Sequence, residues 1–482
     1  MAAIDALEQP EQPEQADGTD AGTFLAIDPA TGELLDRLPR GGTAEIDEAV
    51  RAARRAFERE REWRRPAVRA GVLTEIGRAI TNAAEELAVL ESRDTGKPLG
   101  QARADVAVAA RYFHYYAGWA DKVYGQQIPL GDEYLDYTVR EPWGVCGQII
   151  PWNYPLQVGA RLAAPALACG NAVVLKPAEE ASLTPLRLAA IAHAAGLPEG
   201  LFRVAPGYGE EAGAALVAHP DVDHLSFVGS PAVGSAIAQI AARRLVPVSL
   251  ELGGKSPNVV FEDADIDAAL PMIVRAVVQN AGQTCSAGSR LIVHEAVAER
   301  VIEGLGARMR ALRLGPGLAD PDLGPLISAA QFERARGMVE RARVGGARLV
   351  AGGHRASGPD YEQGFFLQAT LLADVDTSSE IWREEVFGPV LAATTFRAED
   401  DAIRLANSTD YGLVAGLWTR DLGRAHRVAR AVRAGQIFVN TYGAGGGVEI
   451  PFGGYRRSGY GRGKGQEAVL TFSQVKNVCV AL

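Results

Sequence analysis

The feature that most constrains this chain is a regular alternation of short apolar runs and helical stretches that begins at Val145. Runs rich in β-branched residues lie at 145–150, 172–175, 201–204, 225–228 and 246–250, with helix-like stretches at 157–168, 184–195, 210–218 and 233–242. This order predicts a parallel sheet covered by helices on both faces, because parallel neighbours need a crossover connection. Ligands bind to such sheets beyond the carboxyl ends of the strands, so polar residues that follow the apolar runs are the first candidates for a site.

A second alternating section runs from residue 258 to about 440. Its strand-like runs lie at 258–261, 289–293, 348–351, 390–396, 415–418 and 436–439, and helix-like stretches such as 296–312 and 329–344 separate them. Amphipathic patterns in the first part predict helices over 43–57, with Thr43 as the N-cap, over 69–90 and over 101–120. Residues 122–140 predict a hairpin or extended arm, and 470–480 predict a terminal strand that pairs with an edge in this or another subunit.

Composition and charge narrow the class of partner. The net charge of −10 argues against nucleic acid or an anionic membrane as the main partner. Residues 1–22 are acidic and rich in Gln and Pro, which predicts a disordered tail and not a signal peptide. No apolar run reaches the roughly 18 residues that span a bilayer. We therefore expect a cytoplasmic protein without a nucleic-acid or membrane partner.

The four cysteines are far apart in sequence, with no CxxC pair and no histidine cluster at metal-ligand spacing, so neither a disulfide framework nor a metal site is expected. Cys285 differs from the other three because it follows a polar, glycine-containing turn (279–284) and is flanked by small residues. A cysteine attacks carbonyls as its thiolate and needs partial access. Free cysteines are more often buried structural thiols, so both interpretations stay open at this point.

Two polar segments that follow strands suit a nucleotide. Gly229 and Ser230 end a strand and begin a helix, where N–H groups bind a pyrophosphate, although an ordinary N-cap explains them equally well. Lys176 and Glu179 follow another strand, where the carboxylate would accept hydrogen bonds from ribose hydroxyls and repel a 2′-phosphate. The alternative is a solvated charge pair. A full GxGxxG motif is absent, and Gly207-Tyr208-Gly209 is only a loose relative.

Asn153 and Glu251 are polar residues in unusual settings. Asn153 lies between aromatics and prolines directly after a strand, where its side-chain N–H could donate to a developing oxyanion. Glu251 ends a buried-looking strand and precedes Gly253 and Gly254, which permit close approach. A partly desolvated Glu has a raised pKa and can act as a general base near neutrality. Each residue also fits an ordinary turn at a strand end.

In combination these motifs resemble the NAD(P)-dependent aldehyde dehydrogenase superfamily, from about residue 24 to the C-terminus. They are, in chain order, Pro-Trp-Asn-x-Pro, Lys-Pro-x-Glu, Phe-x-Gly-Ser, Glu-Leu-Gly-Gly-Lys, Gly-Gln-x-Cys and Glu-x-Phe-Gly-Pro. The resemblance implies an aldehyde dehydrogenase-like α/β fold with a Rossmann-type NAD-binding domain (23–122 and 143–253), an α/β catalytic domain (254–447) and a small bridging β domain for oligomerisation (123–142 and 448–482). It also implies a homodimer or homotetramer.

The resemblance implies a reaction as well. Cys285 attacks an aldehyde, the side chain of Asn153 and the backbone N–H of Cys285 stabilise the oxyanion, and hydride transfer to NAD leaves a thioester that water activated by Glu251 hydrolyses. Lys176 and Glu179 would contact the adenosine ribose, Ser230 the pyrophosphate and Glu385 the nicotinamide ribose, with Phe387 beside it. The other implied cofactor contacts are Ile149, Pro151, Trp152, Gly209, Gly229 and Leu252.

Departures from the family pattern bear on the substrate. Arg161 replaces a common Trp and predicts a contact with an anionic tail, although Gln279 replaces the second Arg of the relatives that bind such tails. A glycine-rich stretch at 443–447 replaces a loop that often carries an aromatic, which favours a bulky or cyclic aldehyde, while Phe452 matches the aromatic near the nucleophile. Gly463 replaces a Glu and is expected to affect a subunit contact and not the chemistry.

Three other functions are alternatives to aldehyde oxidation. A CoA-acylating semialdehyde dehydrogenase would pass the thioester to a thiol, and the presence of Glu251 as a hydrolytic base argues against it. Glu179 argues against an NADP-dependent reductase. The joint presence of Cys285, Asn153 and Glu251 argues against a non-catalytic member of the fold.

Overall fold

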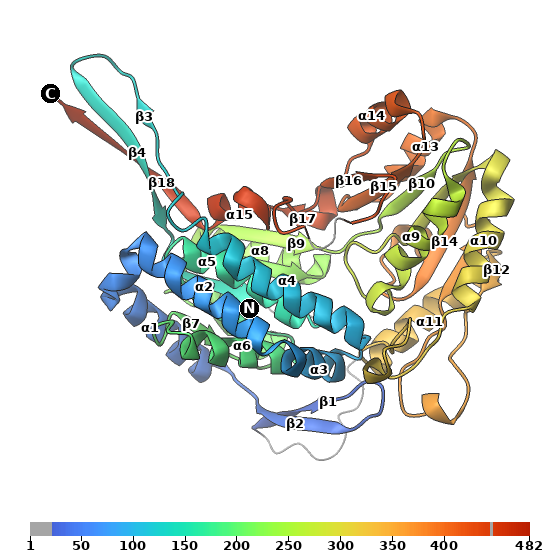
Figure 1. Cartoon of the computed structure of the whole chain (residues 1–482), viewed down its shortest axis with the longest axis horizontal. Helices are drawn as coiled ribbons and strands as arrows, with labels where there is room; N and C mark the ends of the chain where they lie inside the picture. The colour runs from blue at the N-terminus through green and yellow to red at the C-terminus, as the bar shows by residue number, and fades with distance from the viewer. Residues whose placement is uncertain (1–21, 444–446) are drawn as a thin grey trace.

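The computed structural model describes residues 22–443 and 447–482. Two α/β units, each built on its own sheet, lie side by side, and a narrow antiparallel sheet projects from one of them (Figure 1). The predicted disordered tail lies outside the described residues, apart from Gly22. Within the described part, no helix is both long and apolar enough to cross a membrane.

The first sheet confirms the alternation that begins at Val145. Its strand order is β17-β9-β8-β5-β6-β7, and β5 to β9 are parallel. The strands are β5 (Val145–Ile149), β6 (Ala172–Lys176), β7 (Phe202–Val204), β8 (His224–Gly229), β9 (Val248–Leu252) and the antiparallel edge strand β17 (Gly459–Tyr460). The register pairs Ile149 with both Lys176 and Phe227, and Val228 with Glu251, so the carboxyl ends of these strands form one edge.

Helices cover both faces of this sheet. They are α1 (Thr43–Arg59), α2 (Pro66–Asn82), α3 (Ala84–Thr95), α4 (Leu99–Ala117), α5 (Pro155–Ala168), α6 (Leu183–Ala194), the π-turn η3 (Gly209–Gly213) with α7 (Ala214–Ala218), and α8 (Pro231–Arg244). The single helix predicted over 69–90 is two helices that meet at Ala83, and the second one packs against α4. The N-cap of α1 is Gly42 and not Thr43, because the side chain of Glu45 accepts a hydrogen bond from the N–H of Gly42 at 2.8 Å.

The second sheet has the order β12-β13-β14-β11-β10-β15-β16, parallel except for the pair β12 and β13. Its strands are β10 (Pro257–Val260), β11 (Arg290–His294), β12 (Arg348–Ala351), β13 (Thr370–Ala373), β14 (Val390–Phe396), β15 (Val414–Trp418) and β16 (Gln436–Val439). The helices around it are α9 (Ile266–Val278), α10 (Ala298–Arg310), α11 (Ala329–Val344), α12 (Glu380–Arg383), α13 (Glu399–Ala406) and α14 (Leu422–Ala431). The sequence did not predict β13, a four-residue strand without alternation because both of its faces are buried.

The projecting arm consists of β3 (Gln127–Ile128), β4 (Tyr134–Pro142) and β18 (Ser473–Ala481) (Figure 1). The predicted hairpin is confirmed, and the terminal strand pairs with β4 of its own chain from Ser473 opposite Pro142 to Ala481 opposite Tyr134. The strand begins later than predicted because α15 (Gly465–Thr471) precedes it. Near the start of the described chain, β1 (Thr23–Ile27) and β2 (Leu34–Pro39) form an antiparallel hairpin around Asp28. Short 3₁₀ turns complete the fold: η2 (Arg61–Arg64), η4 (Gln279–Gly282), η5 (Glu295–Val297), η6 (Gly317–Ala319), η7 (Pro359–Tyr361) and η8 (Arg456–Ser458).

Candidate active site

A cavity of about 1580 Å³ lies between the two sheets. The ends of β5, β8 and β9 contribute Asn153, Ser230 and Glu251 to its lining, and the second α/β unit contributes Cys285 and Glu385. By contrast, Cys146 and Cys169 are buried and Cys479 is exposed. The structure therefore brings the candidate nucleophile to the same cavity as the polar residues that follow the strands of the first sheet.

The turn that carries Cys285 has a constrained backbone. Asn280, Ala281 and Gly282 have φ values of 51°, 54° and 73°, so three consecutive residues are left-handed. This conformation costs a residue such as Ala281 roughly 1–2 kcal/mol. A Cβ atom at Gly282 would overlap the backbone of Gly388, so this position requires glycine for both conformation and space. Non-glycine residues held in this way are typical of functional sites, and the turn presents a half-buried thiol to the cavity.

Hydrogen bonds join the loop of Asn153 to the cysteine turn. The side chain of Asn153 donates to the backbone oxygen of Gln283 at 2.8 Å, and the side chain of Asn280 donates to the backbone oxygen of Asn153 at 2.8 Å. The hydroxyl groups of Tyr154 and Thr284 are 2.7 Å apart. Because these bonds cross from one α/β unit to the other, they hold the amide of Asn153 in a fixed relation to Cys285.

A buried lysine that sequence reasoning missed lies behind this loop. The ammonium group of Lys97 donates to the backbone oxygen of Asn153 at 3.0 Å and forms ion pairs with Glu91 and Asp105 at 3.0 and 2.7 Å. Burial opposes the charge on Lys97, but Asp105 and Glu91 raise its pKa above the usual value. Lys97 follows a helix in a Gly-Lys-Pro turn, and no periodicity there indicates that its side chain points inward.

The glycine pair after Glu251 lets the two units approach each other. A Cβ atom at Gly254 would lie 2.5 Å from the backbone oxygen of Cys285, and one at Gly253 would overlap the carboxyl group of Glu385. The backbone N–H of Gly254 donates to Glu385 at 3.0 Å. The prediction that this glycine pair permits a close approach is confirmed.

The thiol of Cys285 carries its proton at neutral pH in this arrangement. Burial raises the pKa of Cys285 to about 11, although the nearby guanidinium of Arg161 opposes the shift. A thiol with this pKa becomes a strong nucleophile only as it loses its proton. Attack on a carbonyl at this position therefore depends on donors that stabilise the negative charge passed to the substrate oxygen.

Arg161 and Glu251 form an ion pair at 2.5 Å, and each is only 6% exposed. The guanidinium of Arg161 also lies 5.2 Å from the ring centre of Phe452, and the ammonium of Lys464 lies 5.2 Å from the same ring. Burial and the neighbouring Arg161 lower the pKa of Lys464 to about 8. Both Arg161 and Glu251 were candidates from sequence, but their pairing was not predicted, because they belong to different elements 90 positions apart.

Gly463 lies against this pair. A Cβ atom at Gly463 would overlap the Oε1 atom of Glu251. The sequence did not indicate that this residue lies next to Glu251, and whether it affects the chemistry stays a prediction. The segment reaches the site because β17 pairs with β9, placing Gly459 opposite Glu251.

The predicted cofactor contacts fall into two groups. One group lines the cavity: Pro151, Trp152, Gly229, Ser230, Glu385 and Phe387. The rings of Trp152 and Phe387 meet edge to face at 5.2 Å, and burial raises the pKa of Glu385 to about 7. Ser230 is also the N-cap of α8, since it accepts a hydrogen bond from the N–H of Val233 at 3.3 Å. The alternative N-cap interpretation is therefore correct, and it places Ser230 at the cavity.

The second group of predicted contacts lies outside the cavity lining and comprises Ile149, Lys176, Glu179, Gly209 and Leu252. Lys176 is buried and forms an ion pair with the half-buried Glu179 at 3.0 Å, so this pair is not fully solvated. Lys176 is in register with Ile149 at the edge of the sheet, and Gly209 begins the π-turn η3. Among the residues described here, no group of His, Cys, Asp and Glu could hold a metal ion.

The sequence profile of the aldehyde dehydrogenase family matches residues 16–478. The chain belongs to the aldehyde dehydrogenase family. It is 42% identical over 464 residues to the protein named "Putative aldehyde dehydrogenase DhaS" from Bacillus subtilis (strain 168), an alignment that covers 95% of this chain and 92% of that protein.

Solved structures agree with this assignment over nearly the whole length. A crystal structure named "Putative Aldehyde Dehydrogenase" from Burkholderia cenocepacia matches with a TM-score of 0.93 at 52% identity, covering 95% of this chain and 96% of that one. The NAD+ complex of an aldehyde dehydrogenase from Bacillus cereus matches with a TM-score of 0.93 at 40% identity, covering 95% and 93%. The α/β fold predicted from sequence is thereby confirmed as that of an aldehyde dehydrogenase.

Proposed function

We propose that this chain oxidises an aldehyde to the carboxylic acid with NAD+, through a covalent intermediate on Cys285. The observation that carries the proposal is the meeting of Cys285, Asn153 and Glu251 at one cavity between the two sheets. Family membership supports the class of reaction, and a relative from Bacillus cereus was solved with NAD+.

The residues at the cavity fit a dinucleotide. At Gly229 and Ser230, where α8 begins, backbone N–H groups can donate hydrogen bonds to the pyrophosphate. The carboxyl group of Glu385 can accept hydrogen bonds from ribose hydroxyls. Lys176 and Glu179 are assigned to the adenosine ribose at the adjacent strand end. When bound, NAD+ accepts the hydride. We accordingly assign residues 23–122 and 143–253 to cofactor binding and 254–447 to catalysis.

The remaining chemistry belongs to side chains of this chain. The sulfur of Cys285 attacks the carbonyl carbon, and the oxyanion accepts hydrogen bonds from the backbone N–H of Cys285 and the side chain of Asn153. One N–H of the Asn153 amide is anchored on Gln283, which leaves the other for the oxyanion. Each such donor typically contributes about 2.7–4 kcal/mol. Glu251 then takes a proton from the water that hydrolyses the thioester.

The first test is aldehyde-dependent formation of NADH at 340 nm with a panel of aldehydes, using NAD+ and NADP+ in parallel. We expect activity with NAD+ and its complete loss in Cys285→Ala, because no other described cysteine lines the cavity. Activity that survives in Cys285→Ala would rule out the covalent mechanism. The panel also identifies the preferred aldehyde.

A CoA-acylating semialdehyde dehydrogenase is the alternative function. It would share Cys285 but transfer the acyl group to a thiol instead of water. Glu251, which lines the cavity and pairs with Arg161, supports hydrolysis. Product analysis with and without CoA distinguishes the two, and formation of acyl-CoA in place of the free acid would establish the alternative.

The finer proposal for the substrate concerns Arg161 and Phe452, which both line the cavity. The Nε atom of Arg161 is buried and has no hydrogen-bond partner among the described residues, which supports a contact with an anionic tail. Succinic semialdehyde and hexanal, compared in wild type and Arg161→Leu, test this point. A larger loss on succinic semialdehyde is expected, and equal losses would exclude the tail contact.

We also propose that the protein is a homodimer or homotetramer. The arm formed by 123–142 and the end of the chain projects from the molecule (Figure 1). Several of its apolar side chains are exposed. These include Leu130, Leu135, Val475 and Val480, which are 54%, 43%, 57% and 42% exposed. Apolar side chains gathered on a projecting sheet are typical of an interface.

A further inference from the structure

The proposed deacylating base, Glu251, is already engaged by a cation. Its carboxylate lies 2.5 Å from the guanidinium of Arg161, which comes from the middle of α5, and both side chains are almost fully buried. A buried carboxylate without a partner is strongly disfavoured and tends to take up a proton. Arg161 supplies the opposite charge beside the carboxyl group that is proposed to accept a proton from water, so it bears directly on the proposed hydrolysis.

The space for this pairing exists because residue 463 is glycine. Any Cβ atom there would overlap Oε1 of Glu251. The backbone at Gly463 does not have a left-handed φ, so its conformation alone does not require glycine. It is held in place by a reciprocal pair of hydrogen bonds with Phe452 at 2.7 and 2.8 Å, and the ring of Phe452 packs on Arg161. The absence of a side chain at Gly463 therefore leaves the space that the carboxyl group of Glu251 occupies.

We propose that Arg161 is a positioning residue for deacylation, and that it and the gap at Gly463 hold the carboxyl group of Glu251 in place and oriented for the attack of water on the acyl-enzyme at Cys285. The inference rests on the proposed function. In the step concerned, the water oxygen bonds to the thioester carbon while Glu251 accepts a water proton. The carbon–sulfur bond then breaks, the acid leaves, and the proton passes to the sulfur of Cys285. Acylation of Cys285 does not use Glu251. Arg161 does oppose the raised pKa of Cys285, so its loss should slow acylation, but much less than it slows deacylation.

The test separates the two half-reactions with p-nitrophenyl acetate in the absence of NAD+. Transfer of the acetyl group to Cys285 releases nitrophenolate in a first phase, and hydrolysis of the acetyl-enzyme limits the second phase. Quenched samples analysed by intact mass give the lifetime of the acetyl-enzyme directly. Acetyl carries no anionic tail, so this readout is independent of any contact between Arg161 and a substrate carboxylate.

We expect Arg161→Leu to form acetyl-enzyme at a rate within about threefold of wild type and to hydrolyse it at least tenfold more slowly. Arg161→Lys, which retains a cation, should recover most of the hydrolysis rate. In a Glu251→Gln background, Arg161→Leu should add no further slowing, because the two residues act as one unit. Unchanged acetyl-enzyme lifetime in Arg161→Leu, or full additivity with Glu251→Gln, would overturn the inference.

Gly463→Ala provides an independent variant, because its methyl group displaces Glu251 while Arg161 stays in place. It should also lengthen the lifetime of the acetyl-enzyme at least tenfold and leave acylation unaffected. Gly71→Ala is the matched control, since a Cβ atom at Gly71 meets nothing within 4 Å and should change neither phase. A wild-type lifetime in Gly463→Ala would refute the role of the gap. If wild type forms no acetyl-enzyme at Cys285, the proposed function itself fails, which is a separate outcome.

Discussion

At the scale of single residues, the site depends on positions where a side chain is absent as much as on those where one is present. Gly253 and Gly254 allow contact between the strand end of Glu251 and the cysteine turn, and Gly463 leaves the space that Glu251 fills. Ala281 is held in a left-handed conformation in the turn that carries Cys285. The position of Cys285 therefore depends on close approach between backbone segments, which single substitutions can disturb.

The first prediction concerns the thiol. Its pKa of about 11 lies above the usual value of 9.0, so the thiolate fraction and the rate of alkylation should rise about tenfold per pH unit below pH 11. The charged groups facing the sulfur are Arg161, Lys464, Glu251 and Glu385. Iodoacetamide labelling, quantified by peptide mass spectrometry to exclude the exposed Cys479, measures this profile. A plateau reached below pH 9 would contradict it.

The second prediction concerns Gly254. A Cβ atom there would lie 2.5 Å from the backbone oxygen of Cys285, so Gly254→Ala must shift the cysteine turn. A displacement of about 1 Å costs roughly 100-fold in rate. We expect kcat for aldehyde oxidation to fall by about that factor while the circular dichroism spectrum stays unchanged. Near wild-type kcat would show that the turn adapts without affecting catalysis.

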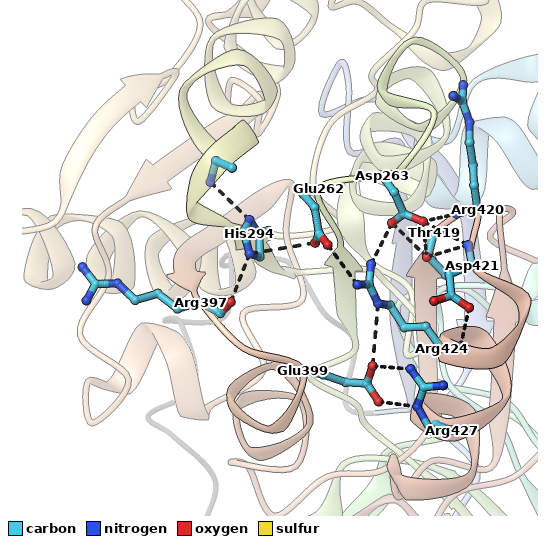
Figure 2. A network of polar contacts seen from close by, with 11 residues as sticks. Glu262, Asp263, His294, Arg397, Glu399, Thr419, Arg420, Asp421, Arg424 and Arg427 are labelled. Carbon is cyan, nitrogen blue, oxygen red and sulfur yellow. Dashed lines mark hydrogen bonds and ion pairs between the residues drawn. The ribbon is translucent and has the colours of Figure 1, made fainter.

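At the scale of elements, one arginine joins two helices of the second α/β unit to the end of strand β10 (Figure 2). Arg424 of α14 forms ion pairs with Glu262 and Asp263 after β10 at 2.9 Å each, and its guanidinium lies 4.6 Å from the ring centre of Phe261. It also approaches Glu399 of α13 at 3.6 Å. The side chain is only 19% exposed, so its contacts are better shielded than those of a surface pair. One side chain thus connects α13 and α14 to the end of β10.

The third prediction follows from this network. Arg424→Ala leaves three carboxylates close together without their shared cation and should destabilise the protein by about 1–3 kcal/mol. Arg427→Ala is the control. Arg427 is 58% exposed, and its ion pair among the described residues is with Glu399, so its loss should cost less than about 1 kcal/mol. The midpoint of urea unfolding, followed by fluorescence, compares the two. Equal midpoints for both variants would contradict the assigned role.

Asp263, in the same network, predicts how the stability of the folded protein changes as the pH falls. Burial opposes the charge on Asp263, yet hydrogen bonds from Thr419 and from the backbone of Arg420 and Asp421 lower the pKa of Asp263 below 3.8. A group whose pKa is lower in the folded than in the unfolded state stabilises the folded protein at pH values above its unfolded-state pKa. This stabilisation is lost as the pH falls through its folded-state pKa. The advantage of wild type over Asp263→Asn in unfolding midpoint should therefore persist at pH 5 and diminish below pH 4. An advantage that grows towards low pH would contradict the assignment.

At the scale of the whole molecule, the C-terminal segment connects the parts of the fold. After β16 the chain returns to the first sheet as β17, passes Glu251, forms α15 and ends in the arm as β18 (Figure 1). The same segment therefore contributes Gly463 to the site and β18 to the projecting sheet. About ten residues of chain separate Gly463 from the start of β18, so the geometry around Glu251 lies close in sequence to the arm.

The last prediction tests the arm. Light scattering should show wild type as a dimer or tetramer, and Val475→Asp should shift the population towards smaller species, because Val475 is 57% exposed on β18. Val344→Asp is the matched control at the end of α11, where Val344 is 81% exposed, and it should leave the mass unchanged. A monomeric wild-type protein would exclude the proposed assembly.

The sequence by itself predicted the alternating elements, the α/β class and the family. Periodicity and turn residues are local properties, so the strands from Val145 and the helix over 329–344 could be read directly. Motif order was sufficient to select Cys285, Asn153 and Glu251. Elements without a local signal were missed: β13 is short and buried on both faces, and the break at Ala83 has no glycine or proline to mark it.

Only the tertiary structure decided how the site residues are paired. Arg161, Glu251 and Gly463 come from α5, β9 and the segment after β17, and nothing local to any of them indicates the others. The same holds for Lys97 beneath the loop of Asn153. Pairing of this kind depends on the register of distant strands and on the packing of α5 against the sheet. Sequence pattern therefore specified which chemistry the chain carries, while long-range packing decided which partner each charged group has.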